Sequence, residues 1–190
     1  MEIIQRFKDG NQRFIENRLT NRNWPEQVQS TRSGQFPYAV VLSCIDSRVP
    51  IEIVLDQGLG DIFSIRVAGN ILNEDVLASM EYGCSVAGAK VILVMGHSKC
   101  GAVTSACKNV KAGNMTSLLS KIHPAVSKIK EPGSEFTDHE IEQVSQINVK
   151  HVINQISEKS DILDRMLKER KIVIIGSFYD VATGKVAFDV

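Results

Sequence analysis

The sequence predicts an α/β fold in which helices flank a mostly parallel central β-sheet. Short apolar runs rich in β-branched residues recur along the chain, and segments with the spacing of amphipathic helices lie between them. The runs that begin at Tyr38 and Val91 are apolar throughout, as expected of strands that a parallel sheet buries on both faces. We therefore expect about four parallel strands, a further strand at one edge, and an N-terminal helical arm.

The N-terminal helical arm is predicted to cover residues 1–33. Apolar side chains recur near helical spacing in residues 2–18, where Gly10 marks a point at which the helix can break. A second helix is expected to start at Trp24-Pro25, because proline suits the first turn of a helix. The pattern alone allows the first helix either to cover its own domain or to embrace a partner subunit.

Five segments are predicted to be strands, because they combine apolar side chains with flanking turn residues. In chain order they are residues 38–42, 62–67, 91–95, 171–175 and 186–190. Helical segments separate most of them, which favours parallel pairing through helical crossovers. The last segment follows a turn at Thr183-Gly184 and is expected at an edge of the sheet.

Capping residues predict the boundaries of several helices. Asn73 suits the N-cap of a helix over 74–87, because its side chain can accept a hydrogen bond from the first turn, where two acidic residues lie. A short helix is expected over 50–55. Another helix is expected to follow Gly101 and to end at Gly113-Asn114, since both residue types tolerate the left-handed conformation of a helix end.

The region 115–169 is predicted to be mostly helical. Thr137 and Glu140 have the spacing of a capping box, and apolar residues continue at helical spacing beyond them. Cys84 and Cys107 fall inside predicted helices and lack the spacing of metal ligands. We interpret both of these cysteines as core residues.

Length and composition restrict the classes of function. The chain has 190 residues, and we expect residues 1–190 to form a single domain with a buried core. Its 22 basic and 22 acidic residues cancel, which gives no reason to expect nucleic acid or a membrane as a partner. The first residues lack the features of a signal peptide, and the four cysteines suggest no disulfide framework, so we expect a cytoplasmic location.

Chemically active side chains directly follow two of the predicted strands. Cys44 follows the strand over 38–42, and His97 and Cys100 follow the strand over 91–95. Because open parallel sheets bind ligands beyond the carboxyl ends of their strands, we expect these side chains to lie close together. Zinc accepts two thiolates and one imidazole, and three protein ligands leave its fourth position open for water. Each residue alone would also suit a buried core position, but the two motifs together favour a catalytic zinc site.

Two motifs carry a resemblance to a known family. Cys-Ile-Asp-Ser-Arg at 44–48 and Gly-His-Ser-Lys-Cys-Gly at 96–101 resemble the β-class carbonic anhydrases, which carry Cys-x-Asp-Ser-Arg and His-x-x-Cys. The similarity covers most of the chain, including residues 49–50, 61–63, 66–70 and 179–180. Many relatives read Arg-Asn-Val-Ala-Asn where this chain reads Arg-Val-Ala-Gly-Asn at 66–70, so we expect the pocket wall to differ there.

The resemblance implies a lyase that holds one zinc ion per subunit and interconverts carbon dioxide and bicarbonate through a zinc-bound hydroxide. It implies that Arg48 binds the carboxylate of Asp46, and that Asp46 accepts a hydrogen bond from the hydroxide and orients it. In a closed state of such enzymes the aspartate becomes the fourth zinc ligand. A surface ion pair is the simpler interpretation of Asp46 and Arg48, but their position beside Cys44 favours the catalytic one.

Three further residues match substrate-binding positions of the family. Gln35 matches a glutamine whose amide binds a substrate oxygen, Phe63 matches a residue that lines the apolar carbon dioxide pocket, and Gly101 matches a backbone donor to bicarbonate. Without the resemblance, Phe63 would be interpreted as a core residue and Gln35 as an ordinary loop residue. The resemblance also implies a homodimer or a dimer of dimers, in which the N-terminal arm embraces the partner.

The resemblance also bears on regulation by bicarbonate. Some bacterial relatives bind it at a second, inhibitory site that consists of a tryptophan, an arginine and a tyrosine. Arg66 and Tyr179 match the arginine and the tyrosine, but Val41 stands in place of the tryptophan and lacks its hydrogen-bond donor. We therefore expect no strong cooperative inhibition by bicarbonate.

Two other functions stay open at this point. Some relatives use the same kind of zinc site on carbonyl sulfide or carbon disulfide, and the size of the pocket would decide between these substrates. A module that stores zinc or senses oxidants through its thiolates is an alternative from a different class. The pair of Asp46 and Arg48 argues against storage, because storage needs no carboxylate beside an open coordination position.

Overall fold

The computed structural model describes residues 2–190 and contains a five-stranded sheet with the strand order β2-β1-β3-β4-β5. β1 pairs in parallel with β2 and β3, and β3 pairs in parallel with β4. β5 runs antiparallel to β4 at the edge, so the predicted fold class is confirmed. The strands span Ala39–Ser43 (β1), Ile62–Arg66 (β2), Val91–His97 (β3), Val173–Tyr179 (β4) and Val186–Phe188 (β5).

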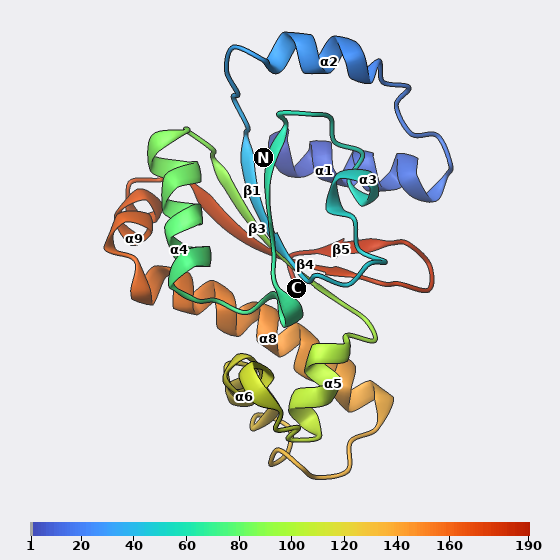
Figure 1. Ribbon diagram of the computed structural model, residues 1–190, viewed down its shortest axis with the longest axis vertical. Helices are drawn as coiled ribbons and strands as arrows, with labels where there is room; N and C mark the ends of the chain where they lie inside the picture. Colours follow the sequence, from blue (N-terminus) through green and yellow to red (C-terminus); the bar gives the residue numbers. More distant parts are fainter. Residues whose placement is uncertain (1) are drawn as a thin grey trace.

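Helices cover both faces of this sheet (Figure 1). One face carries α1 (Glu2–Ile15) and α3 (Ile51–Val54), and the other carries α4 (Glu74–Glu81), α8 (Asp138–Lys159) and α9 (Asp161–Lys168). Three shorter helices pack together beyond the carboxyl ends of the strands: α5 (Gly101–Cys107), α6 (Gly113–Ser120) and α7 (His123–Val126). This end of the sheet also carries the two motifs that the sequence singles out.

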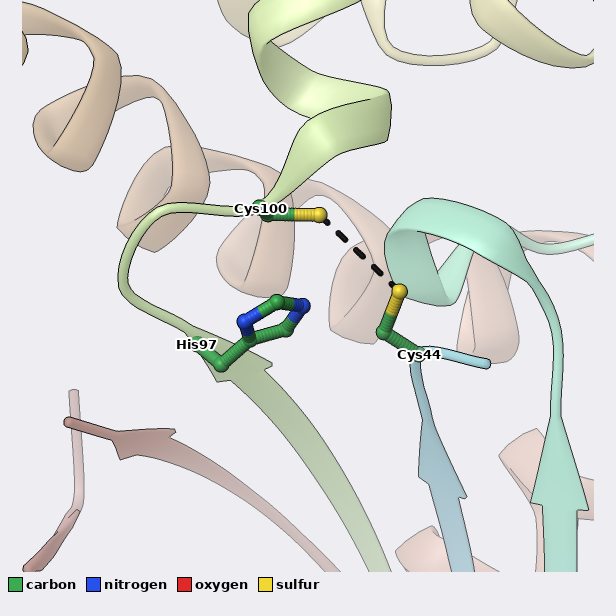
Figure 2. A group of neighbouring side chains, drawn as sticks. All are labelled: Cys44, His97 and Cys100. Carbon is green, nitrogen blue, oxygen red and sulfur yellow. Dashed lines mark hydrogen bonds between the residues drawn. The ribbon is translucent and has the colours of Figure 1, made fainter. Parts of the chain in front are cut away.

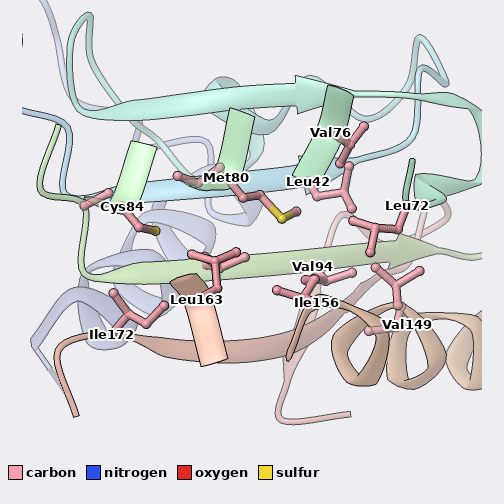
Figure 3. Packing of buried hydrophobic residues seen from close by; sticks show 14 residues of the cluster. Leu42, Leu72, Val76, Met80, Cys84, Val94, Val149, Ile156, Leu163 and Ile172 are labelled. Carbon is pink, nitrogen blue, oxygen red and sulfur yellow. The ribbon is translucent and has the colours of Figure 1, made fainter. Parts of the chain in front are cut away.

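The alternation of side chains along β1 divides the core into two layers. Val40 and Leu42 belong to the layer under α4, α8 and α9, whereas Ala39 and Val41 belong to the layer under α1 and α3. Figure 3 shows Leu42 and Val94 among the side chains of the first layer. Each fully buried aliphatic side chain contributes about 1.5–3 kcal/mol to stability. Burial on both faces explains why the central strands read as continuous apolar runs.

α1 is a single unbroken helix, and its apolar face packs on its own domain. A Cβ atom at Gly10 would lie 1.9 Å from the carbonyl oxygen of Leu55, so glycine here permits close approach to the end of α3 instead of breaking the helix. Phe7 is fully buried in the layer under α1 and α3. Of the two possibilities that the pattern left open, the buried side of the first helix thus covers its own domain.

A buried asparagine fixes α1 to the far end of the chain. Nδ2 of Asn11 donates to the carbonyl oxygens of Val54 and Gly184, at 3.1 and 2.9 Å. Its Oδ1 accepts a hydrogen bond from the N–H of Val186 at 2.9 Å. The N-terminal helix is therefore tied to β5 and to the turn that precedes it.

A buried carboxylate ties the segment before α2 to the same domain. The side chain of Asp56 is fully buried and forms ion pairs with Arg13 of α1 and with Arg22. Thr20 adds hydrogen bonds from its hydroxyl group and from its N–H. Asp56 thus pairs with two guanidinium groups that approach it from different parts of the arm.

α2 (Trp24–Thr31) lies apart from the sheet, at the top of Figure 1, and buries none of its residues. It begins at the predicted position, where Asn23 caps it by accepting from the N–H of Glu26. Trp24 and Val28 remain about half exposed, at 51% and 53%. None of the helices within residues 2–190 has the length and apolar content that a membrane crossing requires.

α5 ends earlier than the sequence predicts. Asn109 adopts the left-handed conformation, with φ of 51°, and the N–H of Val110 bonds to the carbonyl oxygen of Ser105. These are the features of a helix C-cap, so asparagine ends α5 before the chain reaches Gly113. Gly113 instead begins α6.

Two predicted caps are confirmed. Asn73 accepts a hydrogen bond from the N–H of Val76, and Thr137 forms a complete capping box with Glu140 at the start of α8. α4 is shorter than predicted, because a π-helix (η2, Tyr82–Val86) replaces its last turns. β4 begins two residues later than predicted and extends to Tyr179.

Candidate metal centre

Cys44, His97 and Cys100 converge beyond the carboxyl ends of β1 and β3 (Figure 2). Cys44 follows β1 directly, His97 ends β3, and Cys100 precedes the first residue of α5. Because β1 and β3 are parallel neighbours, their ends place the two sequence motifs side by side. All three side chains are buried, and the structure therefore brings together the three predicted metal ligands.

The donor atoms have the spacing of a tetrahedral zinc site. They lie within 4.8 Å of one another, and the Sγ atoms of Cys44 and Cys100 are 3.9 Å apart. Two Zn–S bonds of about 2.3 Å at a tetrahedral angle place their sulfur atoms about 3.8 Å apart. The residues thus fit zinc, and a set of three protein donors is typical of a catalytic site.

A hydrogen bond fixes the imidazole ring of His97. Its Nδ1 donates to the carbonyl oxygen of Ser98 at 2.9 Å, which leaves Nε2 with a free lone pair. Nε2 is buried and has no hydrogen-bond partner within the described chain, residues 2–190. A buried polar atom of this kind costs free energy unless it binds a partner, and a metal ion is the partner that the two neighbouring sulfurs suggest.

Ser98 is held in turn by the segment that follows β4. Its N–H donates to the carbonyl oxygen of Tyr179, and its hydroxyl group donates to Asp180 and accepts from the N–H of Val181. Hydrogen bonds from Thr183, from backbone N–H groups and from Ser98 hold the pKa of Asp180 below its usual value, so it stays an acceptor. The chain after β4 therefore orients His97 through Ser98.

The hydrogen bond between the two thiols favours ionisation of Cys44. The hydrogen bond with Cys100 lowers the pKa of Cys44 to about 4, while the same bond and burial raise the pKa of Cys100. The N–H of Gly69 also donates to the Cys44 sulfur, at 3.3 Å. The thiolate is the form of cysteine that binds metal ions, so this site is ready to accept one.

Arg48 binds both carboxylate oxygens of Asp46, as predicted. Its Nε lies 2.9 Å from Oδ1, and its Nη2 lies 2.7 Å from Oδ2. These hydrogen bonds hold the pKa of Asp46 well below its usual value, so the carboxylate is ionised at neutral pH. Asp46 therefore presents a charged, fixed acceptor next to the three donor atoms.

Arg66 supports the loop that carries Cys44 and Asp46. Its Nε donates to the carbonyl oxygen of Cys44 at 3.1 Å, and its Nη2 donates to the carbonyl oxygen of Asp46 at 2.6 Å. Arg66 ends β2, which lies beside β1 in the sheet. Its guanidinium thus fixes the backbone on both sides of Ile45.

The three predicted substrate-binding residues lie in different places. Gly101 begins α5 beside the metal ligands, with open space where a Cβ would be. Gln35 is exposed and precedes β1, whereas Cys44 follows it. Phe63 lines a cavity of about 570 Å³ between β2 and Tyr82. A five-residue strand spans about 16 Å, so the chain does not bring Gln35 or Phe63 to its own metal ligands.

Comparison with known proteins decides the family. The family model described as Carbonic anhydrase matches residues 39–186. This chain belongs to the β-class carbonic anhydrases. Carbonic anhydrase 2 of Mycobacterium tuberculosis is 31% identical over 188 residues, which cover 94% of this β-carbonic anhydrase and 87% of that protein. The carbonic anhydrase of Mycolicibacterium smegmatis is 32% identical over 189 residues, with 95% and 88% covered.

Solved β-carbonic anhydrases share the fold of this chain. A tetrameric enzyme of Sordaria macrospora superposes with a TM-score of 0.77 at 23% identity, covering 86% of both chains. An enzyme of Aspergillus fumigatus gives a TM-score of 0.75 at 26% identity, covering 86% of this chain and 80% of that one. β-Carbonic anhydrases catalyse the zinc-dependent hydration of carbon dioxide, and the donor set of this β-carbonic anhydrase fits zinc.

Three groups at the site of this β-carbonic anhydrase escape the sequence analysis. Ser98 orients His97 through its main-chain carbonyl, and Gly69 contacts Cys44 through its N–H. Both act through backbone groups, which the identity of a residue does not reveal. The Arg-Val-Ala-Gly-Asn sequence at 66–70, which differs from that of many relatives, is the only signal near Gly69. Asn148 of α8 donates to the carbonyl oxygen of Gly69, and a polar residue inside an otherwise apolar helical stripe is the signal that would have found it.

Proposed function

We propose that Cys44, His97 and Cys100 hold one zinc ion per subunit, and that the chain catalyses the reversible hydration of carbon dioxide to bicarbonate and a proton. The observation that carries this proposal is the buried Nε2 of His97, which has a free lone pair and lies near the two sulfurs. An ionised carboxylate beside an open coordination position adds the group that a reaction with water needs.

A zinc ion held by Cys44, His97 and Cys100 would supply a Lewis acid that lowers the pKa of a bound water molecule. Asp46 would accept a hydrogen bond from that water, because an ionised carboxylate can only accept. This bond would orient the oxygen toward the carbon of carbon dioxide. Arg48 keeps the carboxylate charged and in place. We also assign Asp46 as the fourth metal ligand of a closed state.

The assignment of substrate-binding groups follows from where they lie. The N–H of Gly101, at the start of α5 and next to Cys100, is assigned to a bicarbonate oxygen. Gln35 and Phe63 are assigned to the pocket of a second copy of the chain, because Gln35 is exposed and Phe63 is only partly buried in β2, an edge strand of the sheet. In this arrangement Phe63 supplies an apolar wall for carbon dioxide and Gln35 supplies an amide donor.

Exposed apolar side chains support association into a homodimer or a dimer of dimers. Phe36 is 89% exposed, and Trp24, Val28 and Leu59 expose about half of their surface. We call these four residues the arm surface. Apolar side chains gathered in this way mark interfaces between proteins. The Sordaria macrospora enzymes, which share the fold, are tetrameric.

We also propose a domain organisation and a cellular location for the chain. Residues 1–190 are proposed to form one domain, since the arm over residues 1–33 is anchored to the sheet by Asn11 and Asp56. A cytoplasmic location is proposed because all four cysteines are free and two of them form the metal centre. Free thiols are typical of reducing compartments such as the cytosol.

A carbon dioxide hydration assay tests the proposed function. Protein with one zinc per subunit is expected to accelerate the acidification of carbon-dioxide-saturated buffer, and removal of zinc by a chelator is expected to abolish the acceleration. Zinc-loaded protein without any effect on the rate would refute the proposal. Activity only on carbonyl sulfide or carbon disulfide would assign the same site to a different substrate.

A further inference from the structure

Asn148 occupies a position where an apolar residue would be expected. It lies in the middle of α8 and is fully buried, with Val149 and Val152 of the core close by in the same helix. Asparagine is a poor helix former, and a buried amide costs free energy unless it is hydrogen-bonded. Its Oδ1 has no partner anywhere in residues 2–190. The one hydrogen bond that the side chain of Asn148 donates therefore explains why an amide occupies this buried position.

That bond leads to the metal centre. Nδ2 of Asn148 donates to the carbonyl oxygen of Gly69 at 2.9 Å, and the N–H of the same Gly69 donates to the Sγ of Cys44 at 3.3 Å. Both groups of Gly69 are thus occupied, one by α8 and the other by a metal ligand. The N–H of Gly69 lies in the peptide plane between Ala68 and Gly69. Asn148 binds the carbonyl group of the next plane, between Gly69 and Asn70, and so restrains the turn from the other side of the residue.

Gly69 has a conformation that only a glycine adopts easily here. Its φ is +66°, and a Cβ atom would lie 2.6 Å from the side chain of Ile122 and 3.2 Å from that of Ala102. A glycine in this turn is free to change its conformation when nothing holds it. The hydrogen bond from Asn148 adds a side-chain constraint to this peptide plane, which the N–H of Asn70 also holds by donating to the carbonyl oxygen of Val67 at 2.9 Å.

We infer that Asn148 is a positioning residue of this enzyme, which fixes the turn at Gly69 so that its N–H stays on the sulfur of Cys44. The inference rests on the proposed zinc site. Hydrogen bonds to a metal-ligating sulfur withdraw charge from it and fix its direction, and such outer contacts tune both affinity and reactivity. Two thiolates donate more charge than imidazoles do, so a donor that moderates one of them matters for the chemistry.

The test compares two substitutions on the same helix. Asn148→Leu keeps the branching and the number of heavy atoms of the side chain and removes the donor. Ser145→Ala, one turn earlier, removes a buried hydroxyl group that has no hydrogen-bond partner among the described residues, and it serves as the matched control. The readouts are zinc affinity by chelator competition and the sulfur-to-metal charge-transfer band of protein loaded with cobalt.

We expect Asn148→Leu to weaken zinc binding by about 10-fold or more, to shift the charge-transfer band, and to lower kcat more than it raises KM. Ser145→Ala is expected to change none of these. A folded Asn148→Leu variant with the wild-type band and wild-type zinc affinity would show that Asn148 serves packing alone. A wild-type protein that takes up no cobalt or zinc would instead refute the proposed metal site, so the two failures are distinguishable.

A measurement on the wild-type protein covers the case in which Asn148→Leu does not fold. In protein loaded with cadmium-113, an N–H that donates to a metal-bound sulfur shows a scalar coupling to the metal across the hydrogen bond. The amide proton of Gly69 is expected to show this coupling through Cys44. If that coupling is absent, Gly69 does not donate to the sulfur and Asn148 has no part in the metal centre.

Discussion

Oδ2 of Asp46 lies 4.0 Å from Nε2 of His97, so the ionised carboxylate lies next to one of the three donor atoms. The carboxylate cannot turn freely, because Arg48 binds both of its oxygens. A fixed acceptor at this distance can orient a water molecule but is not needed to hold zinc. The roles of the ligands and of Asp46 can therefore be separated by substitution.

Asp46→Asn is expected to retain one zinc per subunit and to lower kcat by about 100-fold or more, because the amide can donate where the carboxylate only accepts. Metal analysis and stopped-flow carbon dioxide hydration measure the two effects. Asp164→Asn, which removes an exposed carboxylate paired with Lys168, is the control and should change neither quantity. Loss of zinc from Asp46→Asn to the extent seen with Cys44→Ala would make Asp46 a required ligand instead.

Cys44→Ala, His97→Ala and Cys100→Ala are each expected to lose zinc on dialysis and to lose turnover, because two protein ligands hold the ion poorly. Cys107→Ala is the matched control, since Cys107 is a buried free thiol outside the metal centre. It should keep its zinc and lose only about 1 kcal/mol of stability. Full zinc content in any of the first three variants would remove that residue from the ligand set.

Asp56→Asn is expected to lower the free energy of unfolding at pH 7 by about 3 kcal/mol, because it leaves Arg22 without its buried partner. Burial raises the pKa of Asp56, but hydrogen bonds from Arg22, Arg13 and Thr20 outweigh it and lower the pKa overall. The stabilisation is thus complete above the unfolded pKa of about 4 and is lost as the pH falls toward the lower folded value.

The measurement is denaturant unfolding of wild type and Asp56→Asn between pH 7 and pH 3. Because Asp56 lies outside the metal centre, both proteins are expected to release zinc at the same acidic pH, and their difference in stability then reports Asp56. This difference should shrink only below about pH 4. A difference that stayed constant down to pH 3 would mean that the charge of Asp56 contributes nothing.

Arg66→Ala is expected to lower turnover with zinc retained, because it releases the carbonyl oxygens of Cys44 and Asp46. Its guanidinium is engaged by these carbonyls, and Val41 is fully buried without a donor group, so no second site for bicarbonate is expected. Initial rates against bicarbonate at fixed pH and ionic strength should fall along a shallow hyperbola. A steep sigmoidal loss that Arg66→Ala removes would establish an inhibitory site.

Substituting both Trp24 and Val28 with lysine should convert the associated protein to monomers, because it places two charges on the arm surface. Sedimentation velocity measures the change. Met115→Lys, at an exposed apolar residue of α6, is the control. The monomer is expected to keep zinc and lose most turnover, since Gln35 and Phe63 then no longer reach a neighbouring site. A fully active wild-type monomer would contradict this prediction.

Much of the fold and the metal centre can be predicted from sequence, because the features that define them lie close together along the chain. Each ligand follows an apolar run closely, and parallel strands end at one edge of a sheet, so strand prediction also places Cys44 and His97. The pair of Asp46 and Arg48 lies within three residues, where chain geometry nearly ensures contact. The caps at Asn73 and Thr137 depend only on their own helices.

The features that sequence analysis missed depend on distant or competing groups. Gly10 continues α1 because the carbonyl of Leu55 lies against it, which no pattern within α1 reveals. Asn109 ends α5 before Gly113, because two residues compete for one cap and the earlier one forms it. Asn148 and Gly69 lie far apart in sequence and meet only after α8 has packed on the sheet.

The hydrogen bonds of Asn11 have a consequence for how the chain is made. Two of its three partners, Gly184 and Val186, are synthesised more than 170 residues later. At the usual 5–20 residues per second, α1 waits about 10–35 s on the ribosome for the partners that fix it. During this time Phe7 has no complete core to enter, and the nascent chain has to remain soluble with that side chain exposed. α1, which precedes every other element described here, therefore reaches its final place among the last.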